Sequence, residues 1–315
     1  MLTSFFGNSK PVTLVFAIVY MLVFYVLSFW LYDAFPEQSD QWLQMGAVCA
    51  LLPLSMLVFN FIVRKNVLTA GNSYGVITMA VSISLIPLLT DGWLEACAVF
   101  SLLLASRRIF SLRSERNLER KILDASLWIG IATLFHAGSI MMVIPLIWSI
   151  SIRSFSSPRL FVIPLFGLGS VTVLSWTFSL LRYGDSSWLL NRIPEFNFDL
   201  SLYGQWPLVY GLMTLATLIL ITGLFIIANY NREARKDRPT ILLYGLTLFF
   251  LLISGALTER LDGSEWLFPA SMLGVGWANL IDRLKKTEFK EVALWLLLLL
   301  PVLPYLIRIL GIEQV

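Results

Sequence analysis

The hydrophobic positions of this 315-residue chain fall into apolar runs separated by short polar connections. A bilayer core about 30 Å thick needs roughly 20 apolar residues in a helix that rises about 1.5 Å per residue. The pattern predicts an all-α polytopic bundle of about eleven transmembrane helices, forming one integral membrane domain over residues 1–315. The predicted runs are 12–31, 42–63, 76–89, 96–105, 125–135, 140–152, 160–181, 208–230, 241–257, 266–281 and 292–310.

Four of these runs are short, and they form two helical hairpins at 76–105 and 125–152. Short apolar helices are stable in a membrane where protein rather than lipid surrounds their ends. We therefore expect the hairpin tips at 90–92 and 136–139 to lie below the outer surface and to line a cavity. Two alternatives stay open: each pair is a re-entrant hairpin, or the helices extend a few residues beyond the apolar runs.

Composition agrees with a membrane protein. Hydrophobic residues make up 57% of the chain and charged residues 14%, with a mean hydropathy of +0.78. Soluble domains carry about 25% charged residues. The chain has one histidine and two cysteines, Cys49 and Cys97, both inside apolar runs, which excludes a classical zinc site. A net charge of only +3, spread between apolar runs, argues against nucleic acid as a partner.

The basic residues predict the orientation of the chain. If the N-terminus is cytoplasmic and every run crosses once, 19 of the 23 Lys and Arg residues lie in cytoplasmic segments. The four others are Arg182, Arg192, Arg260 and Arg308. Membrane proteins retain positive charge on the cytoplasmic side, so we predict a cytoplasmic N-terminus and an external C-terminus. The basic segment 107–121 is explained by this rule alone.

The stretch 64–145 resembles the middle of GT-C glycosyltransferases, which take sugars from polyprenyl-phosphate donors. The residues that carry this resemblance are IPLLTDG at 86–92, the Arg pair at 107–108, WIGIATLFH at 128–136 and the proline-bearing helix at 138–145. The resemblance implies a GT-C-like helical core that acts on lipid-linked glycans at the periplasmic face. The sequence departs from that family in its first external loop, which has only ten residues, 32–41.

The whole chain also resembles a family of uncharacterised Bacteroidota multi-pass membrane proteins of about 300 residues. The opening segment 1–11, with Ser4-Phe5-Phe6 and Lys10-Pro11, and the segment 124–135 carry this second resemblance. It implies the bacterial inner membrane as the location and implies no particular activity.

Asp33 is the preferred catalytic candidate, because it follows the first apolar run directly and an acid at a helix end can point into a cavity. Glycosyl transfer uses a carboxylate to activate the acceptor or to hold a divalent cation beside the donor phosphate. The sequence specifies no cofactor. A divalent cation is the one cofactor that glycosyl transfer of this kind would use. The alternative for Asp33 is a solvated interfacial acid that marks the helix end.

Asp91 and Glu95 lie four residues apart, so they share one face if both are helical. Asp91 is also explained as a helix N-cap. Glu95 has apolar neighbours, and a carboxylate at membrane depth is costly, which makes it the second catalytic candidate.

His136, Arg182 and Arg192 are the remaining candidates, for binding the phosphate of a substrate. Histidine can hydrogen-bond a phosphate or carry a proton, and arginine binds phosphate in a bidentate manner. The alternatives are a histidine that satisfies helix carbonyls, and arginines that pair with acids of the loop 182–206.

Three functions follow from these patterns. The first is glycosyl transfer on lipid-linked glycans, with Asp33 as base or metal ligand and Glu95, His136 and Arg182 around the donor phosphate. The second is a transporter or flippase of an amphipathic lipid, and the third is a non-catalytic subunit that anchors a partner complex. The partners implied are the lipid bilayer, a polyprenyl-phosphate lipid and another membrane protein.

Overall fold

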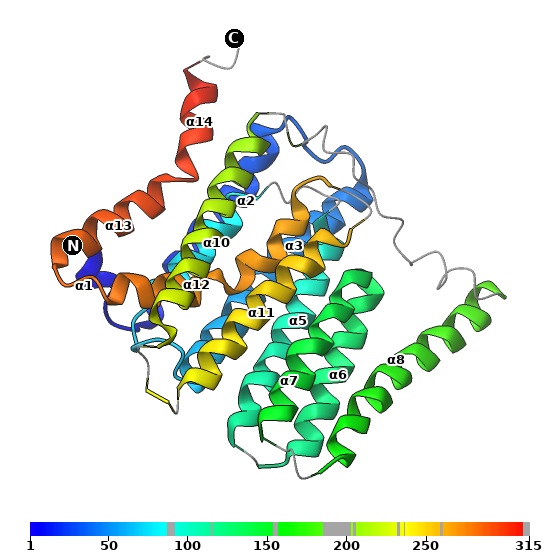
Figure 1. The fold of residues 1–315 in the computed structure, drawn as a ribbon. Coiled ribbons are helices and arrows are strands. Elements are labelled where there is room, and N and C mark those ends of the chain that lie inside the picture. Colours follow the sequence, from blue (N-terminus) through cyan, green and yellow to red (C-terminus); the bar gives the residue numbers. More distant parts are fainter. Residues whose placement is uncertain are drawn as a thin grey trace.

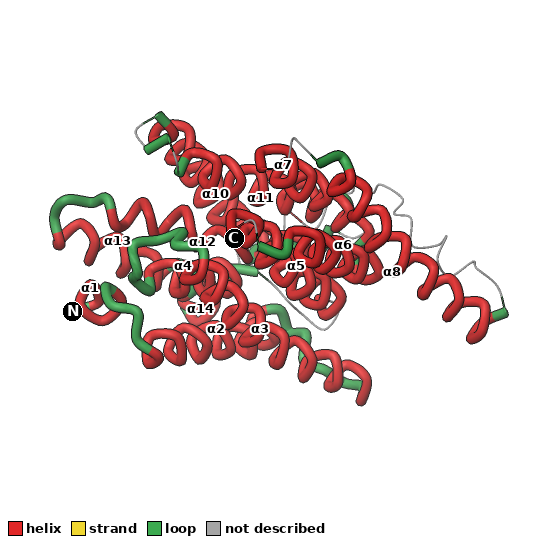
Figure 2. The backbone as a smooth tube through the Cα atoms, turned by 90° about the horizontal axis from the view of Figure 1, so that it is seen from below, coloured by secondary structure: helices red, strands yellow, loops and turns green. Residues whose placement is uncertain are grey.

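The computed structural model of the protein describes residues 1–86, 92–114, 116–153, 157–184, 203, 206–231, 234–235, 237–258 and 261–310. Within these residues the chain forms thirteen α-helices, so the all-α class is confirmed. The helices pack into an elongated bundle, with α8 at one edge and α13 at the other (Figures 1 and 2).

Within the described residues each predicted apolar run overlaps at least one helix, but length and composition qualify fewer of them as membrane spans. In the part of the chain that the structure describes, five helices are long and apolar enough to cross a bilayer. A sixth span results if α13 and α14, which meet at a bend of 53°, count as one. The five are α2 (Pro11–Leu31), α3 (Ser39–Lys65), α8 (Arg159–Tyr183), α10 (Leu208–Tyr230) and α11 (Arg238–Ala256).

Two of the predicted short helices are longer than their apolar runs. Helix α5 (Trp93–Ser111) extends past Arg107 and Arg108, and α6 (Leu118–Phe135) begins before Lys121. Arg, Lys and Glu are good helix formers, and their long side chains reach polar surroundings while the backbone stays helical. The ends of the apolar runs therefore underestimate the lengths of both helices. The returning helix of the second hairpin consists of η3 (Ala137–Met142) and α7 (Val143–Arg153).

Two short helices occupy the centre of the bundle. Helix α4 (Tyr74–Ser84) and helix α12 (Leu267–Asp282) are buried along nearly their whole length. They cross where Gly75 lies against Gly274, and a Cβ atom on Gly274 would come within 2.2 Å of the Gly75 carbonyl oxygen. Glycines at a helix crossing let two backbones approach closely. Protein therefore surrounds these helices, as expected for apolar helices too short to face lipid alone.

The last predicted run is broken into α13 (Thr287–Leu299) and α14 (Val302–Ile309). Pro301 and Pro304 cause the break because proline has no N–H to donate to the preceding turn. Two tyrosines satisfy carbonyls that the break exposes. The Tyr20 hydroxyl donates to the Leu298 carbonyl at 2.7 Å, and the Tyr210 hydroxyl donates to the Leu300 carbonyl at 2.9 Å.

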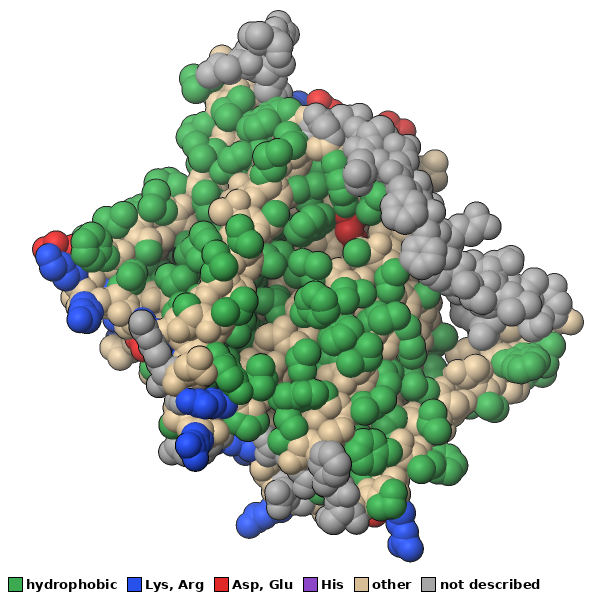
Figure 3. All heavy atoms as spheres, in the orientation of Figure 1, with side chains coloured by type: hydrophobic (Ala, Val, Ile, Leu, Met, Phe, Trp, Pro, Cys, Tyr) green, Lys and Arg blue, Asp and Glu red, His purple; other side chains and the backbone are tan. Residues whose placement is uncertain are grey.

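The bundle has two chemically different ends. We call one the basic end, because Lys65, Arg113 and Arg283 meet there, and the other the opposite end, where Asp33 and Glu265 lie. Lys and Arg side chains gather along the lower and left margins of the molecule, and hydrophobic side chains cover its middle (Figure 3). The remaining short elements are α1 (Leu2–Phe6), η2 (Leu112–Ser114) and η5 (Ser264–Trp266).

Candidate functional site

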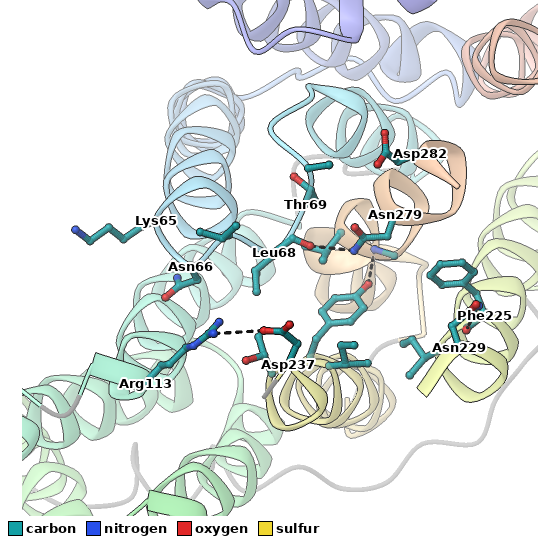
Figure 4. Close-up of a pocket in the computed structure, with 18 of the residues that line it drawn as sticks. Lys65, Asn66, Leu68, Thr69, Arg113, Phe225, Asn229, Asp237, Asn279 and Asp282 are labelled. Carbon is teal, nitrogen blue, oxygen red and sulfur yellow. Dashed lines mark hydrogen bonds and ion pairs between the residues drawn. The ribbon is translucent and has the colours of Figure 1, made fainter. Parts of the chain in front are cut away.

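A pocket of about 900 Å³ opens at the basic end of the bundle. Five segments form it: the loop after α3, the turn η2, the end of α10, the start of α11 and the end of α12 (Figure 4). These segments lie far apart in the sequence and meet only through folding. We call this cavity the basic-end pocket.

The floor and the mouth of the basic-end pocket differ in character. We call the apolar part of the lining, which α10, α11 and α12 supply with Ile226, Ile241, Tyr244 and Val275, the floor. We call the polar part the mouth, and it includes Asn66, Thr69, Ser111, Ser114, Asn229, Thr240 and Asn279. An apolar cavity with a few polar groups at one side is the usual form of a small-molecule site.

Two arginines are held at the mouth. The Arg113 guanidinium pairs with the Asp237 carboxylate at 3.4 Å, and this pair joins η2 to the start of α11 (Figure 4). Arg283 donates to the Asn229 side chain at 2.7 Å, and its guanidinium lies over the Phe225 ring. The Arg113–Asp237 pair is largely exposed and contributes little stability. Arg113 is therefore able to exchange Asp237 for an anionic ligand.

The loop after α3 is fixed against α12 and contains strained backbone. The Asn279 side chain donates to the Leu68 carbonyl at 2.9 Å (Figure 4). Val67, the second residue after α3, has a φ of +53°. The amide of the next residue, Leu68, donates to the Val63 carbonyl at 3.0 Å. Glycine is preferred at this position of a helix C-terminus, and a β-branched residue is rarely found there. Strained residues of this kind cluster at functional sites.

Tyr244 on α11 modifies the backbone bonding of α12 at the pocket floor. Its hydroxyl accepts a hydrogen bond from the Gly276 amide at 2.9 Å and donates to the Met272 carbonyl at 3.2 Å. Those two groups are the pair that a regular α-helix joins directly. A side chain that bonds both partners keeps them satisfied where a helix bends between them. Tyr244 is thus a joint between α11 and α12.

At the opposite end, Asp33 lies in the turn after α2 and pairs with an arginine of α14. It follows α2 with a φ of +51°, and the Ala34 amide bonds back to the Phe29 carbonyl at 2.9 Å. Aspartate tolerates this left-handed conformation better than most residues. Both carboxylate oxygens accept hydrogen bonds from Arg308 of α14, at 2.7 and 2.8 Å. The Asp33 side chain is 79% exposed.

Arg308 connects this ion pair to an aromatic surface. Its guanidinium lies 4.6 Å from the centre of the Trp30 ring, and Trp30 stacks on Tyr305. Arg308 also donates to the Leu31 carbonyl. A second, much smaller pocket lies beside these residues and is lined by Leu31, Tyr32 and Tyr305 among others.

His136 is buried at the tip where α6 ends. One ring nitrogen hydrogen-bonds the Ser254 carbonyl of α11 at 2.7 Å, and the ring contacts Phe268 of α12. Burial lowers the pKa of the imidazole below its usual range. The tip is therefore buried within the protein, and groups of α11 and α12 pack against it. Neither of the two pockets described here includes it.

The hydrogen bonds and the ion pair of Asp33 described above involve none of the remaining candidates. Glu95 lies half-buried in the first turn of α5, and Arg182 lies exposed in the last turn of α8. Helix α8 stands at the edge of the bundle, apart from α2 and α14, in both views of the fold (Figures 1 and 2). Asp91 and Arg192 lie outside the described residues. In the described part of the chain, no group of three His, Cys, Asp or Glu side chains is placed to hold a metal ion.

Sequence reasoning missed Glu265, the buried acid of the opposite end. Glu265 belongs to η5, and it is only 4% exposed. One carboxylate oxygen accepts the Gly263 amide at 2.9 Å, and the other accepts the Tyr203 hydroxyl. Burial raises the pKa of this carboxyl to about 7. The segment 259–265 is an acidic turn in the sequence, and the apolar residues directly after Glu265 are the signal that could have indicated its burial.

The fold and composition define a multi-pass membrane protein whose apolar helices reside in a lipid bilayer. Comparisons with protein-family models, with curated proteins and with solved structures found no match. The resemblances to GT-C enzymes and to the Bacteroidota family therefore rest on the sequence patterns alone.

Proposed function

We propose that this membrane protein binds an amphipathic, phosphate-bearing lipid in the basic-end pocket and transports it. The observation that carries the proposal is the pocket itself, which combines an apolar floor with two arginines at its mouth. Its volume of about 900 Å³ suits a lipid headgroup with the first part of its chain. Arginine at the mouth suits a phosphate, because its planar fork matches phosphate oxygens.

The predicted topology supports the same proposal. If the N-terminus is cytoplasmic, the basic end faces the cytoplasm and the pocket receives lipid from the cytoplasmic leaflet. Lipids with phosphate headgroups, including the polyprenyl phosphates that carry glycans, are available there in a bacterial inner membrane. The proposal includes eleven crossings of the membrane by the chain, in which the longer helices enclose the short ones.

The floor of the pocket provides the first test. Replacing Ile241 by tryptophan places an indole in the floor and should weaken binding of a polyprenyl phosphate at least tenfold, measured by native mass spectrometry on protein in nanodiscs. The matched control is Leu220→Trp, because Leu220 is an exposed residue of α10 that does not line the pocket. Equal affinities in the two variants, or no binding by the unaltered protein, would contradict the proposal.

The arginine at the mouth provides a second arm of the same experiment. Arg113→Gln should weaken binding of the polyprenyl phosphate, whereas Arg116→Gln should not, since Arg116 is an exposed residue of the same segment outside the pocket lining. Inorganic phosphate, added as a competitor, tests whether the site binds a lipid headgroup or free phosphate. If the site is specific for the lipid, phosphate should displace little of the bound lipid. If the site is specific for free phosphate, it should displace most of the bound lipid.

A second candidate function is glycosyl transfer on a lipid-linked glycan at the opposite end. The observation that favours it is the cluster of Asp33 and Arg308 beside Trp30, which places a carboxylate, a phosphate-binding group and an aromatic surface together. In this proposal Asp33 is the base and Arg308 holds the donor phosphate. A divalent cation would need ligands besides Asp33.

Asp33→Asn distinguishes the two candidate functions. Asparagine also adopts the left-handed conformation, so the helix end should persist while the negative charge is lost. The transfer proposal predicts at least a hundredfold loss of complementation activity in a deletion strain, and the transport proposal predicts nearly unchanged activity. Asp33→Gly is the control for the helix end, because glycine keeps the turn and removes the carboxylate.

A further inference from the structure

Glu265 lies at the junction of α11 and α12. The Gly255 residue of α11 packs against the Glu265 backbone, since a Cβ atom on Gly255 would come within 2.4 Å of the Glu265 carbonyl oxygen. Helix α12 begins two residues after Glu265. Any change in the position of this acid therefore acts directly on the start of α12.

Burial is the main reason that the Glu265 carboxyl favours its neutral form, and the nearby Asp262 adds to it, whereas the hydrogen bonds donated by the Gly263 amide and the Tyr203 hydroxyl act the other way. From η5 and the preceding turn come the Gly263 amide and the acid Asp262, and Tyr203 contributes a hydroxyl. On the neighbouring elements, His136 is bonded to Ser254 and is itself held neutral by burial. Within the described residues these partners include no cation. A buried carboxylate without a cationic partner is costly, so the buried position suits the protonated acid.

The other end of α12 forms part of the basic-end pocket. Val275, Gly276, Asn279 and Asp282 line the cavity, and Arg283 follows directly after the helix (Figure 4). Helix α12 is buried along nearly its whole length, so it transmits displacement between its ends as a packed element rather than as a flexible segment.

Tyr244 lies between these two ends. Its hydroxyl bonds both the Met272 carbonyl and the Gly276 amide of α12, so α12 is able to bend there without leaving either group unpaired. Gly276 allows the close approach, because a Cβ atom would lie 2.9 Å from the Tyr244 hydroxyl. The acid, the joint and the pocket thus lie in order along one helix.

We propose that Glu265 is a proton-binding site that controls the basic-end pocket through α12 and the Tyr244 joint. Proton binding to the Glu265 carboxylate removes its charge and favours the buried arrangement described here. Release of the proton makes burial unfavourable, moves η5 outward and shifts the pocket end of α12. This inference rests on the proposed transport function, in which it makes transport dependent on protons at the opposite end.

Spin labels across the pocket test the inference. Labels at Ser114→Cys and Lys285→Cys, in a chain with Cys49→Ala and Cys97→Ala, report the distance from η2 to the end of α12. In nanodiscs we expect this distance distribution to change between pH 5.5 and pH 8.5, with a midpoint near pH 7. The Glu265→Gln variant should keep the low-pH distribution throughout. A distribution that does not change with pH, or an unchanged pH response in Glu265→Gln, would overturn the proposal.

Two further variants make the result specific. Asp262→Asn removes an acid from the same turn while keeping an oxygen for Ser264, so the distance change should persist with a slightly lower midpoint. Tyr244→Phe removes the joint, so Glu265 should still titrate in thermal melting while the distance stops responding. A full distance change in Tyr244→Phe overturns the role of the joint.

The lipid-binding experiment separates this inference from the proposed function. A distance change with pH, together with no polyprenyl-phosphate binding at either pH, overturns the transport function and leaves the proton site. Lipid binding without any distance change overturns the proton site and leaves the lipid pocket.

Discussion

Replacing Gly274 by alanine is expected to prevent stable assembly of the bundle. The new methyl group would lie 2.2 Å from the Gly75 carbonyl oxygen and 3.0 Å from the Phe59 ring. The first of these neighbours is backbone, so α4 and α12 must separate to admit it. Overpacking at such a contact costs about 3 kcal/mol or more. Thermal melting and size-exclusion chromatography in detergent should show a much less stable or aggregated protein.

The matched control for this prediction is Gly223→Ala. Gly223 lies within α10, and a Cβ atom there has no neighbour within 4 Å. Alanine is a better helix former than glycine by up to about 1 kcal/mol, so this variant should be as stable as the unaltered protein or slightly more stable. If Gly274→Ala melted like Gly223→Ala, the close crossing of α4 and α12 would be wrong.

Replacing Glu265 by glutamine is expected to remove a pH dependence of stability. Burial raises the pKa of this carboxyl in the folded protein from 4.5 to about 7. Between these pH values the unfolded chain has released the proton and the folded protein has kept it. The free energy of unfolding therefore falls by on the order of 3 kcal/mol as the pH rises through this window, and it levels off above the window. Glutamine is always neutral, so its melting curve should stay level.

The comparison is made by thermal melting in detergent between pH 5 and pH 8.5. At pH 8 the Glu265→Gln variant should be the more stable protein, and at pH 5 the two should melt nearly together. Asp262→Asn should retain most of the fall, because Asp262 only adds to the effect of burial on Glu265. A parallel fall in Glu265→Gln would place the responsible acid elsewhere.

The helices could be predicted from the apolar runs, but several of their ends could not. Helices α5 and α6 continue into charged sequence, where hydropathy falls although helix propensity does not. The bend between α13 and α14 was foreseeable in principle from Pro301 and Pro304, since proline breaks the backbone bonding of a helix. The apolar residues around these prolines concealed that signal.

The candidate site was predictable only where local sequence controls it. Asp33 was correctly expected at a helix end, and the left-handed turn there follows from neighbouring residues. Its partner Arg308 lies 275 positions away, so only the folded chain brings the two together. The basic-end pocket depends on folding even more, because five separate segments supply its lining. Charge patterning placed Arg113 and Arg283 on one side of the membrane, but could not show that they share a cavity.

The enclosed position of α12 has a consequence for the order of synthesis. Helix α4 is made early, and the partner that covers Gly75 is made almost two hundred residues later. During that interval the neighbours of α4 that are already made are α2 and α3. The face of α4 that α12 covers therefore lacks its final partner until α12 is made. The centre of the bundle is completed only then, with α13 and α14 still to follow in the chain.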